Sequence, residues 1–480
     1  MNIDLVDKTT AWAVHFCATF YSLSQVVAGK TLLSDLPAQY GLYSEILAPI
    51  FKIIGLSIFK YTFVLGILHF AALLSLLVVY WKVQKNKYIF LFYSLTLCLT
   101  TGFTWHFIKS AVWEPYFQYD PIRFFFPAIS LLLQYRLIQK PSEKLSLIIG
   151  VFSAVSMLWN LETGIAIFGA FLSYIGSYIL FPSVLINKKR AVYLIMHLIA
   201  SWTLTLLIFI SYLYIKSDHG IDLSQLFKYQ KIFYKTGFMM LPLPLSPDPW
   251  QIIYGIYLFG IVGALYNWKR QSRSKLWEII FFLSILGLGL FIYYQGRAHV
   301  KVLILVSWPA IFIAFSLLDF LFRLIYLQLI PRVYLLLSIP ILSFSFLTAA
   351  EFFKGIPLLY QSAKKNFSYY YSKNNYDTET KRNLEFIKKN SPSKNILILT
   401  SNQAIYYGEL GFTSPINGPG SAEIILKEDL EKLKKNILQQ ESFFFQPEIN
   451  NLIPLNDILE NFYVVTKNDD NIILYARKNT

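Results

Sequence analysis

Long apolar segments repeat between residues 61 and 349, and short polar connections separate them. A straight helix needs about 20 apolar residues to cross the hydrocarbon core of a bilayer, so these segments predict membrane-spanning helices. The composition agrees, because 55% of the residues are hydrophobic against about 45–50% in soluble domains. Ten spans are predicted, at residues 61–81, 88–105, 124–135, 145–159, 163–181, 191–215, 250–268, 276–294, 302–322 and 333–349.

Basic residues gather in alternate connections, which fixes the expected orientation. Fifteen of them stand there against one acid, Glu143: Lys82, Lys85, Lys87, Arg136, Lys140, Lys144, Lys188, Lys189, Arg190, Lys269, Arg270, Arg273, Lys275, Arg323 and Arg332. Short basic connections stay in the cytoplasm, so we expect the other connections and both termini on the outer face. The net charge of +15 therefore follows from topology, and no nucleic-acid partner is expected.

Residues 1–60 are predicted to lie at the outer membrane surface as a first loop. Two apolar but interrupted stretches, 11–27 and 42–59, are typical of interfacial helices. Between them, residues 29–45 combine acids, an amide, tyrosines and Pro37, which cannot continue a helix. Irregular polar backbone beside membrane helices lies at the interface or lines a cavity, so this stretch is a site candidate.

The chain after residue 350 has the composition of a water-soluble domain. Helices are predicted at 381–390, 404–410 and 423–440, a buried strand at 396–400, and a terminal hairpin with strands 463–466 and 472–476. The predicted fold is thus an α-helical polytopic membrane protein of about ten spans, with a small C-terminal α/β domain on the outer face. Its expected divisions are residues 1–60, 61–349 and 350–480.

Several short motifs carry a family resemblance. They are GKTLLSDLPAQYG at 29–41 with His15 before it, DPIR at 120–123, LWNLETG at 158–164 and YYQGRAH at 293–299. Together with the outer α/β tail, they resemble bacterial integral-membrane glycosyltransferases of the GT-C fold, of the mannosyltransferase-like kind.

The resemblance implies inverting transfer of a sugar from a polyprenyl-phosphate donor to a glycan, lipid or protein acceptor on the outer face of the cytoplasmic membrane. An early acid acts as the base or as a ligand of a divalent cation, Mg²⁺ or Mn²⁺. By order along the chain this acid is Asp4 or Asp7, and Asp35 is a third candidate. The family also begins with a membrane helix, so we expect an apolar segment of about 20 residues upstream of Asp4.

The remaining candidates divide by role. The donor-phosphate candidates are Arg123, Arg297, His299 and Lys301, and the substrate candidates are Gln39, Tyr40, Glu45, Asp120 and Glu162. Each has a structural alternative. Asp35 would cap a turn before Pro37, Arg123 and Arg297 would anchor helix ends in headgroups, and Glu162 would form a fixed ion pair.

Two other functions stay open at the level of sequence. A lipid-glycan transporter or flippase would place ionisable residues deep within spans, and here only Glu278 and Asp319 come near. A degenerate, non-catalytic envelope assembly or scaffold protein is favoured if the membrane helix expected before Asp4 is absent.

Overall fold

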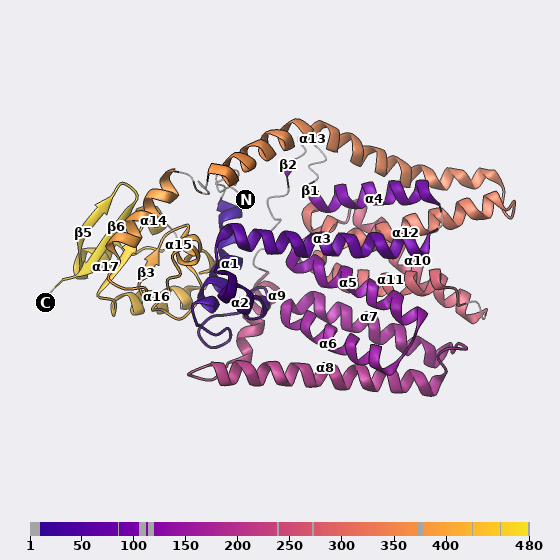
Figure 1. The fold of residues 1–480 in the computed structure, drawn as a ribbon, viewed down its shortest axis with the longest axis horizontal. Coiled ribbons are helices and arrows are strands. Elements are labelled where there is room, and N and C mark those ends of the chain that lie inside the picture. The colour runs from indigo at the N-terminus through magenta and orange to yellow at the C-terminus, as the bar shows by residue number, and fades with distance from the viewer. Residues whose placement is uncertain are drawn as a thin grey trace. The chain divides into compact units, whose positions relative to one another are not determined.

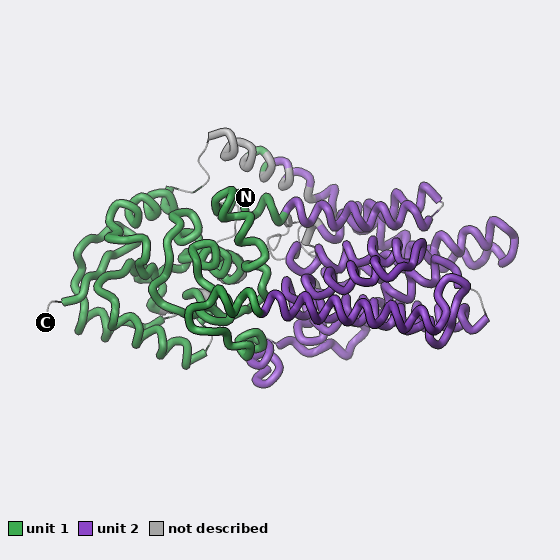
Figure 2. Tube along the Cα trace, turned by 60° about the horizontal axis from the view of Figure 1, so that its bottom comes forward, with its two compact units in different colours: residues 1–65, 211–229, 361–480 green, residues 66–210, 230–360 purple. Residues whose placement is uncertain are grey.

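The computed structural model describes residues 10–84, 86–104, 112–113, 120–237, 240–270, 273–372, 376, 378–424, 426–451 and 453–478. The chain divides into two compact units, each built from segments distant in sequence (Figure 2). Unit 1 contains residues 1–65, 211–229 and 361–480, and unit 2 contains residues 66–210 and 230–360.

Helices dominate the structure (Figure 1). The apolar part of the chain forms α3 (Ile58–Val83), α4 (Lys87–Gly102), α5 (Asp120–Gln139), α6 (Glu143–Trp159), α7 (Leu161–Leu180), α8 (Lys188–Lys216), α9 (Lys228–Thr236), α10 (Pro249–Lys269), α11 (Lys275–Gln295), α12 (Val300–Tyr326) and α13 (Ile339–Ser372). Short strands β1 (Phe103–Thr104) and β2 (Val112–Trp113) pair antiparallel, and the 3₁₀ helices η2 (Leu223–Phe227) and η3 (Arg332–Ser338) precede α9 and α13.

A helix lies at each of the ten predicted spans. Among the described residues, seven helices are long and apolar enough to cross a membrane: Ile58–Val83, Leu161–Leu180, Lys188–Lys216, Pro249–Lys269, Lys275–Gln295, Val302–Tyr326 and Arg332–Lys354. The chain is therefore a helical protein with several membrane-spanning segments. The predicted span at 124–135 is too short, because α5 already begins at Asp120 and runs for 20 residues.

The core of unit 2 is centred on α11, which packs against α7, α10 and α12 (Figure 1). Glycines allow this close packing. A Cβ at Gly287 would come within 2.3 Å of the Tyr257 ring of α10, and one at Gly263 within 2.6 Å of Trp277. Small residues at helix contacts are the usual way in which membrane helices approach each other. Tyr257 then donates a hydrogen bond of 2.9 Å to the Val306 carbonyl of α12, which joins three helices.

In unit 1, α1 (Thr10–Val27) is a core helix, so the prediction of an interfacial helix at 11–27 is wrong. Nearly every side chain from Phe16 to Val26 is buried, including Gln25. The polar interruptions that suggested a surface are satisfied inside, since Gln25 Oε1 accepts the backbone N–H of Ser414 at 2.8 Å. By contrast, α2 (Tyr43–Ile54) leaves apolar side chains such as Ile53 exposed, which is the pattern expected of an interfacial helix.

The C-terminal part of unit 1 contains a four-stranded sheet in the order β3-β4-β6-β5. Its strands are β3 (Leu397–Leu399), β4 (Ser442–Phe445), β5 (Tyr463–Asp469) and β6 (Ile472–Arg477). β3 runs parallel to β4, in register Ile398 to Phe444, and the other pairs are antiparallel. Helices α14 (Thr378–Asn390), α15 (Gln403–Leu410), α16 (Lys427–Ile437) and α17 (Asn456–Phe462), with the 3₁₀ helices η4 (Ser421–Glu423) and η5 (Pro447–Asn451), complete it.

Two details of this part differ from the sequence expectations. The helix predicted at 423–440 begins only at Lys427, because residues 421–423 form the separate turn η4. The terminal hairpin is confirmed. Its first strand continues to Asp469 and its second begins at Ile472, so the turn between them is shorter than predicted. The predicted strand at 396–400 and the helices at 381–390 and 404–410 are confirmed to within a few residues.

Candidate functional site

Three of the sequence motifs meet in unit 2. The motif at 158–164 forms a sharp corner, because α6 ends at Trp159, Asn160 is extended, and α7 begins at Leu161. Asn160 caps α7, and its Oδ1 accepts the backbone N–H of Thr163 at 3.1 Å. The Trp159 indole donates to the Ile122 carbonyl at 2.8 Å, which ties the corner to the start of α5.

The corner also requires a glycine. A Cβ at Gly164 would lie 2.1 Å from the Cα of Met157, well inside van der Waals contact. Gly164 therefore lets α7 fold back closely against α6, and this places Asn160 and Glu162 beside α5. The glycine of the LWNLETG motif is thus required by the close contact between α6 and α7.

Arg123, from the DPIR motif, lies at the centre of the group. It is 8% exposed, and its Nη1 is 2.8 Å from Glu162 Oε2 and 3.4 Å from Asn160 Oδ1. The guanidinium also stacks on the Tyr293 ring, 3.9 Å from the centroid. The fixed ion pair considered for Glu162 is present, and it keeps a buried cation neutralised.

Arg297 approaches the same tyrosine from the YYQGRAH motif. Its guanidinium carbon lies 5.9 Å from the Tyr293 ring centroid and 4.4 Å from that of Phe233 in α9. The backbone on both sides of Arg297 pairs with Leu241, whose N–H donates to the Gly296 carbonyl and whose carbonyl accepts from Ala298. Two guanidinium groups therefore lie within 6 Å of one aromatic ring.

A small cavity of about 20 Å³ adjoins this group. The residues that line it are Arg123, Glu162, Thr163, Gly289, Leu290, Tyr293, Leu305 and Val306. A volume of roughly 10–15 Å³ is enough for one water molecule, so the cavity fits a water and not a sugar ring. We refer to Arg123, Asn160, Glu162, Tyr293 and Arg297 as the arginine cluster.

The other candidates of unit 2 lie near its edges. His299 is exposed and stands at the N-cap of α12, and Lys301 lies in the first turn of that helix. Asp120 is the first residue of α5. The structure brings together Arg123, Glu162 and Arg297 around Tyr293.

In unit 1, Asp35 holds the loop that contains it. Its Oδ2 accepts the backbone N–H of Thr31 at 2.8 Å, and its Oδ1 accepts Asn417 Nδ2 at 3.1 Å. Its carbonyl accepts the backbone N–H of Gly418. The turn-capping alternative considered for Asp35 is therefore present, extended by a link to the C-terminal segment.

Lys30 reinforces that link. Its Nζ donates to the Ile416 carbonyl at 2.7 Å and to Asn417 Oδ1 at 3.0 Å. Burial lowers the pKa of Lys30 to about 8, and the nearby carboxylate of Asp35 opposes the shift. Residues 30–35 are thus fixed by charged and polar contacts on both sides of the loop.

Glu45 stabilises the same loop from within. It is 2% exposed, its Oε1 accepts the Leu32 N–H at 2.8 Å, and its Oε2 lies 2.7 Å from Lys216 Nζ. Lys216 also donates to the Lys30 carbonyl at 2.8 Å. Leu33, with φ of 67°, adopts the left-handed conformation that is uncommon for a non-glycine residue.

Gln39 and Tyr40 follow in an irregular segment. Tyr40 is buried, and its hydroxyl is 3.5 Å from Gln39 Nε2. Gln39 Oε1 is buried and has no hydrogen-bond partner among the described residues. An acceptor of this kind suits a hydroxyl donor from a ligand or an ordered water.

Asp4 and Asp7 lie outside the described residues. Among the residues that the structure does describe, no group of three or more His, Cys, Asp or Glu side chains could hold a metal ion. The divalent cation stays a prediction.

Sequence reasoning missed Lys216, Lys30 and Asn417 as partners of the loop acids, and it named Asn160 and Tyr293 only as parts of motifs. Lys216 stands 171 residues from Glu45, and Asn417 stands 382 residues from Asp35. No local pattern signals pairs at such separations. The motif membership of Asn160 and Tyr293 was the available signal for those two residues.

In comparisons with known proteins, the chain matches no family model, and no curated relative is found.

Proposed function

We propose that this protein is a membrane glycosyltransferase that moves a sugar, with inversion, from a polyprenyl-phosphate donor to an envelope glycan, lipid or protein. The observation that carries the proposal is the convergence of three separate motifs on the arginine cluster. Residues 123, 160–162 and 293–297 belong to segments far apart in the sequence, and Arg123 contacts members of both other segments.

The arginine cluster has the chemistry for a phosphate. A guanidinium offers a planar fork of N–H donors that matches phosphate oxygens. Arg123 is already paired with Glu162 and Arg297 is the more exposed of the two arginines, so we assign first contact with the donor phosphate to Arg297. Transfer leaves negative charge on the departing lipid phosphate, which a preorganised cation stabilises most in the transition state.

The proposal includes a topology. We propose that α4, α5 and α6 also cross the membrane, giving ten spans, and that the arginine cluster lies at the outer end of the helices. The charge asymmetry of the connections supports this orientation, because the cluster lies away from the basic connections. In this topology the protein lies in the cytoplasmic membrane, and residues 350–480 lie on the outer face of that membrane.

For the base we propose Asp4 or Asp7, with Asp35 as a positioning residue. Both carboxylate oxygens of Asp35 hold the loop, which supports the positioning role. Gln39 and Tyr40 would then contact a sugar hydroxyl. Individual Asp→Asn substitutions, scored by transfer at equal expression, test this, and activity lost only in Asp35→Asn would refute it.

The central experiment is Arg297→Lys. Lysine keeps the charge but loses the bidentate fork, so we expect at least about a tenfold loss of transfer from a lipid-linked sugar, with unchanged membrane insertion. The matched control is Arg332→Lys at an exposed position of η3, which should keep wild-type rates. Wild-type transfer by Arg297→Lys would leave Arg297 a membrane anchor and remove the main support for the proposal.

A further inference from the structure

A larger cavity, of about 720 Å³, opens at the other end of α11 in unit 2. Glu278 lies near the first turn of α11 and Tyr293 near its last, so about 20 Å of helix separates this cavity from the arginine cluster. Its walls come from the C-terminal ends of α7 and α10, the start of α11 and the connection after Leu180. A volume of this size is typical of a ligand pocket.

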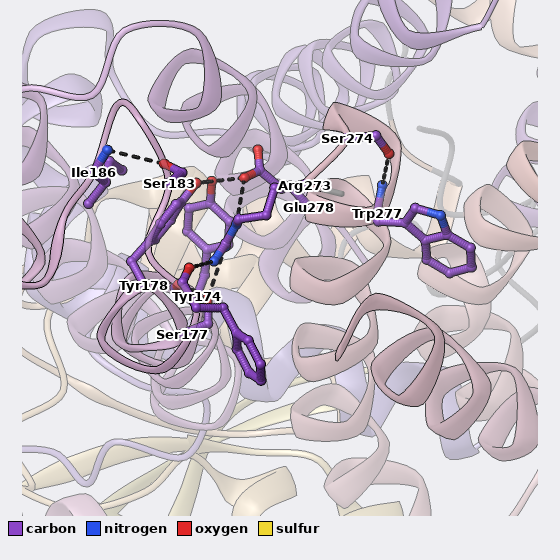
Figure 3. Close-up of polar contacts among 10 residues, drawn as sticks. Tyr174, Ser177, Tyr178, Ser183, Ile186, Arg273, Ser274, Trp277 and Glu278 are labelled. Atoms are coloured by element: carbon purple, nitrogen blue, oxygen red, sulfur yellow. Dashed lines mark hydrogen bonds and ion pairs between the residues drawn. The ribbon is translucent and has the colours of Figure 1, made fainter. Parts of the chain in front are cut away.

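One wall of the cavity is a buried polar network around Arg273 (Figure 3). The Arg273 Nε lies 3.1 Å from Glu278 Oε1, and its Nη2 donates to Ser177 Oγ at 3.1 Å. Its guanidinium is stacked between two rings, 3.6 Å from the Tyr178 centroid and 4.0 Å from the Trp268 centroid. Tyr178 donates to Glu278 at 2.7 Å. This wall is therefore rigid, and the Glu278 carboxylate is already occupied.

The other charges that line the cavity are positive. Lys269 ends α10 and Lys275 begins α11, and both side chains are exposed. Since the single lining acid is used by Arg273, the lining carries an excess of positive charge facing its opening. Such an opening favours an anion.

The rim of the cavity is apolar. Leu180, Val184 and Leu185 line it with exposed fractions of 74%, 103% and 54%. The connection that holds them is well fixed, because Ser183 and Ile186 exchange hydrogen bonds of 2.9 and 3.1 Å, and Arg190 donates to the carbonyls of Leu185 and Pro141. Fixed, exposed apolar side chains beside lysines match one ligand class, an amphiphile with an anionic head.

We propose that this cavity binds an anionic phospholipid from the leaflet at the basic end of the helices. The phosphate lies against Lys269 and Lys275, and an acyl chain covers Leu180, Val184 and Leu185. Basic pockets between membrane helices recognise anionic headgroups in this way. The proposal is independent of the transfer reaction, because none of its residues belongs to the arginine cluster.

The test measures lipid retention by the full-length protein. The protein is placed in nanodiscs of phosphatidylcholine with roughly 20% phosphatidylglycerol and extracted in mild detergent, and its bound lipid is counted by native mass spectrometry. We expect enrichment of phosphatidylglycerol in the wild type. The double variant Lys269→Gln and Lys275→Gln should retain about tenfold less.

The control is Lys188→Gln with Lys189→Gln. It removes the same charge from the neighbouring start of α8, where both lysines are exposed and do not line the cavity, and it should retain phosphatidylglycerol normally. Equal losses in both double variants would show unspecific surface attraction and overturn the proposal. A wild type that does not prefer phosphatidylglycerol would overturn it as well.

A second variant separates a lipid from a free anion. Val184→Ser with Leu185→Ser keeps every lining charge but removes two of the three apolar rim side chains, so phosphatidylglycerol retention should fall while the melting temperature stays unchanged. Retention that is unaffected by this change, together with displacement of the lipid by millimolar inorganic phosphate, would identify a simple anion site and refute the lipid assignment.

Discussion

Glu45 is a carboxylate whose two oxygens both have partners inside unit 1. The Leu32 N–H binds one oxygen and the Lys216 ammonium the other. An ionised carboxylate is stable at 2% exposure only when it is paired and hydrogen-bonded in this way. Glu45 and Asp35 thus shape the loop, whatever else the loop binds, and substitution of either residue is expected to change the loop before it changes any chemistry.

Glu423 is a second buried carboxylate of unit 1, and burial raises its pKa. It is 6% exposed, and its Oε2 accepts the Gly420 N–H at 3.1 Å. Burial raises the pKa of Glu423 from 4.5 to about 8, although the Gly420 hydrogen bond and Lys228 oppose the shift. Below pH 4.5 the carboxyl is neutral in both the folded and unfolded states, so burial carries no charge penalty there. Between pH 4.5 and 8 it ionises only on unfolding, and stability falls as pH rises.

We therefore predict that Glu423→Gln flattens the pH dependence of stability. The wild type should lose stability on the order of 4 kcal/mol between pH 4.5 and 8 from this group, whereas glutamine stays neutral and keeps an acceptor for Gly420. Melting temperatures in detergent at pH 5 and pH 8 measure the effect. The variant should match the wild type at pH 5 and exceed it at pH 8, and parallel curves for the two proteins would contradict the shifted pKa.

At the scale of elements, the corner between α6 and α7 depends on one missing side chain. Gly164 lies so close to Met157 that even a methyl group must push the helices apart. This movement would shift Asn160 and Glu162 away from Arg123, since both residues belong to the corner. The close packing of α6 against α7 therefore also determines the geometry of the arginine cluster.

Gly164→Ala should destabilise the protein by about 1–3 kcal/mol through overpacking. The matched control is Gly169→Ala on the same helix, where an added Cβ meets nothing within 4 Å. That control should leave the melting temperature unchanged or raise it, because alanine favours a helix by roughly 1 kcal/mol over glycine. Equal melting temperatures of the two variants would show that the corner tolerates a Cβ.

Helix α1 shows that tertiary packing can bury a helix whose sequence pattern is typical of a surface helix. Its serines and Gln25 interrupt an apolar run as they would at a membrane surface. In unit 1 the helix packs against α2 and α15, and the Gln25 amide bonds to Ser414. A buried polar group with a partner has the same sequence signature as a solvated one.

At the scale of the whole molecule, the charge of the connections predicts the orientation of the chain in the membrane. We predict that Ser393→Cys reacts with a membrane-impermeant maleimide added to intact cells, and that Lys189→Cys reacts only after permeabilisation. Both positions are exposed. The background should lack Cys17 and Cys98, which are the two native cysteines. If only Lys189→Cys were labelled in intact cells, the predicted orientation would be wrong, and the proposed site would not lie on the outer face.

The sequence by itself determined the helical class, the positions of the apolar helices and most elements of the C-terminal sheet. These depend on local properties, namely the length of an apolar run, the alternation of side chains along a strand, and residues such as Pro37 that cannot continue a helix. The ion pair of Glu162 was foreseen as an alternative for the same reason, because a carboxylate in a short connection between helices needs a cation.

Only the tertiary structure decided which residues meet. Lys216 with Glu45, Asn417 with Asp35, and Arg123 with Tyr293 are pairs separated by 170 residues or more. Such contacts depend on how helices pack around positions like Gly164 and Gly287, where tenths of an ångström matter. A pattern in one segment contains no information about the segment that will face it, so the partners of these charges were not predictable from the sequence alone.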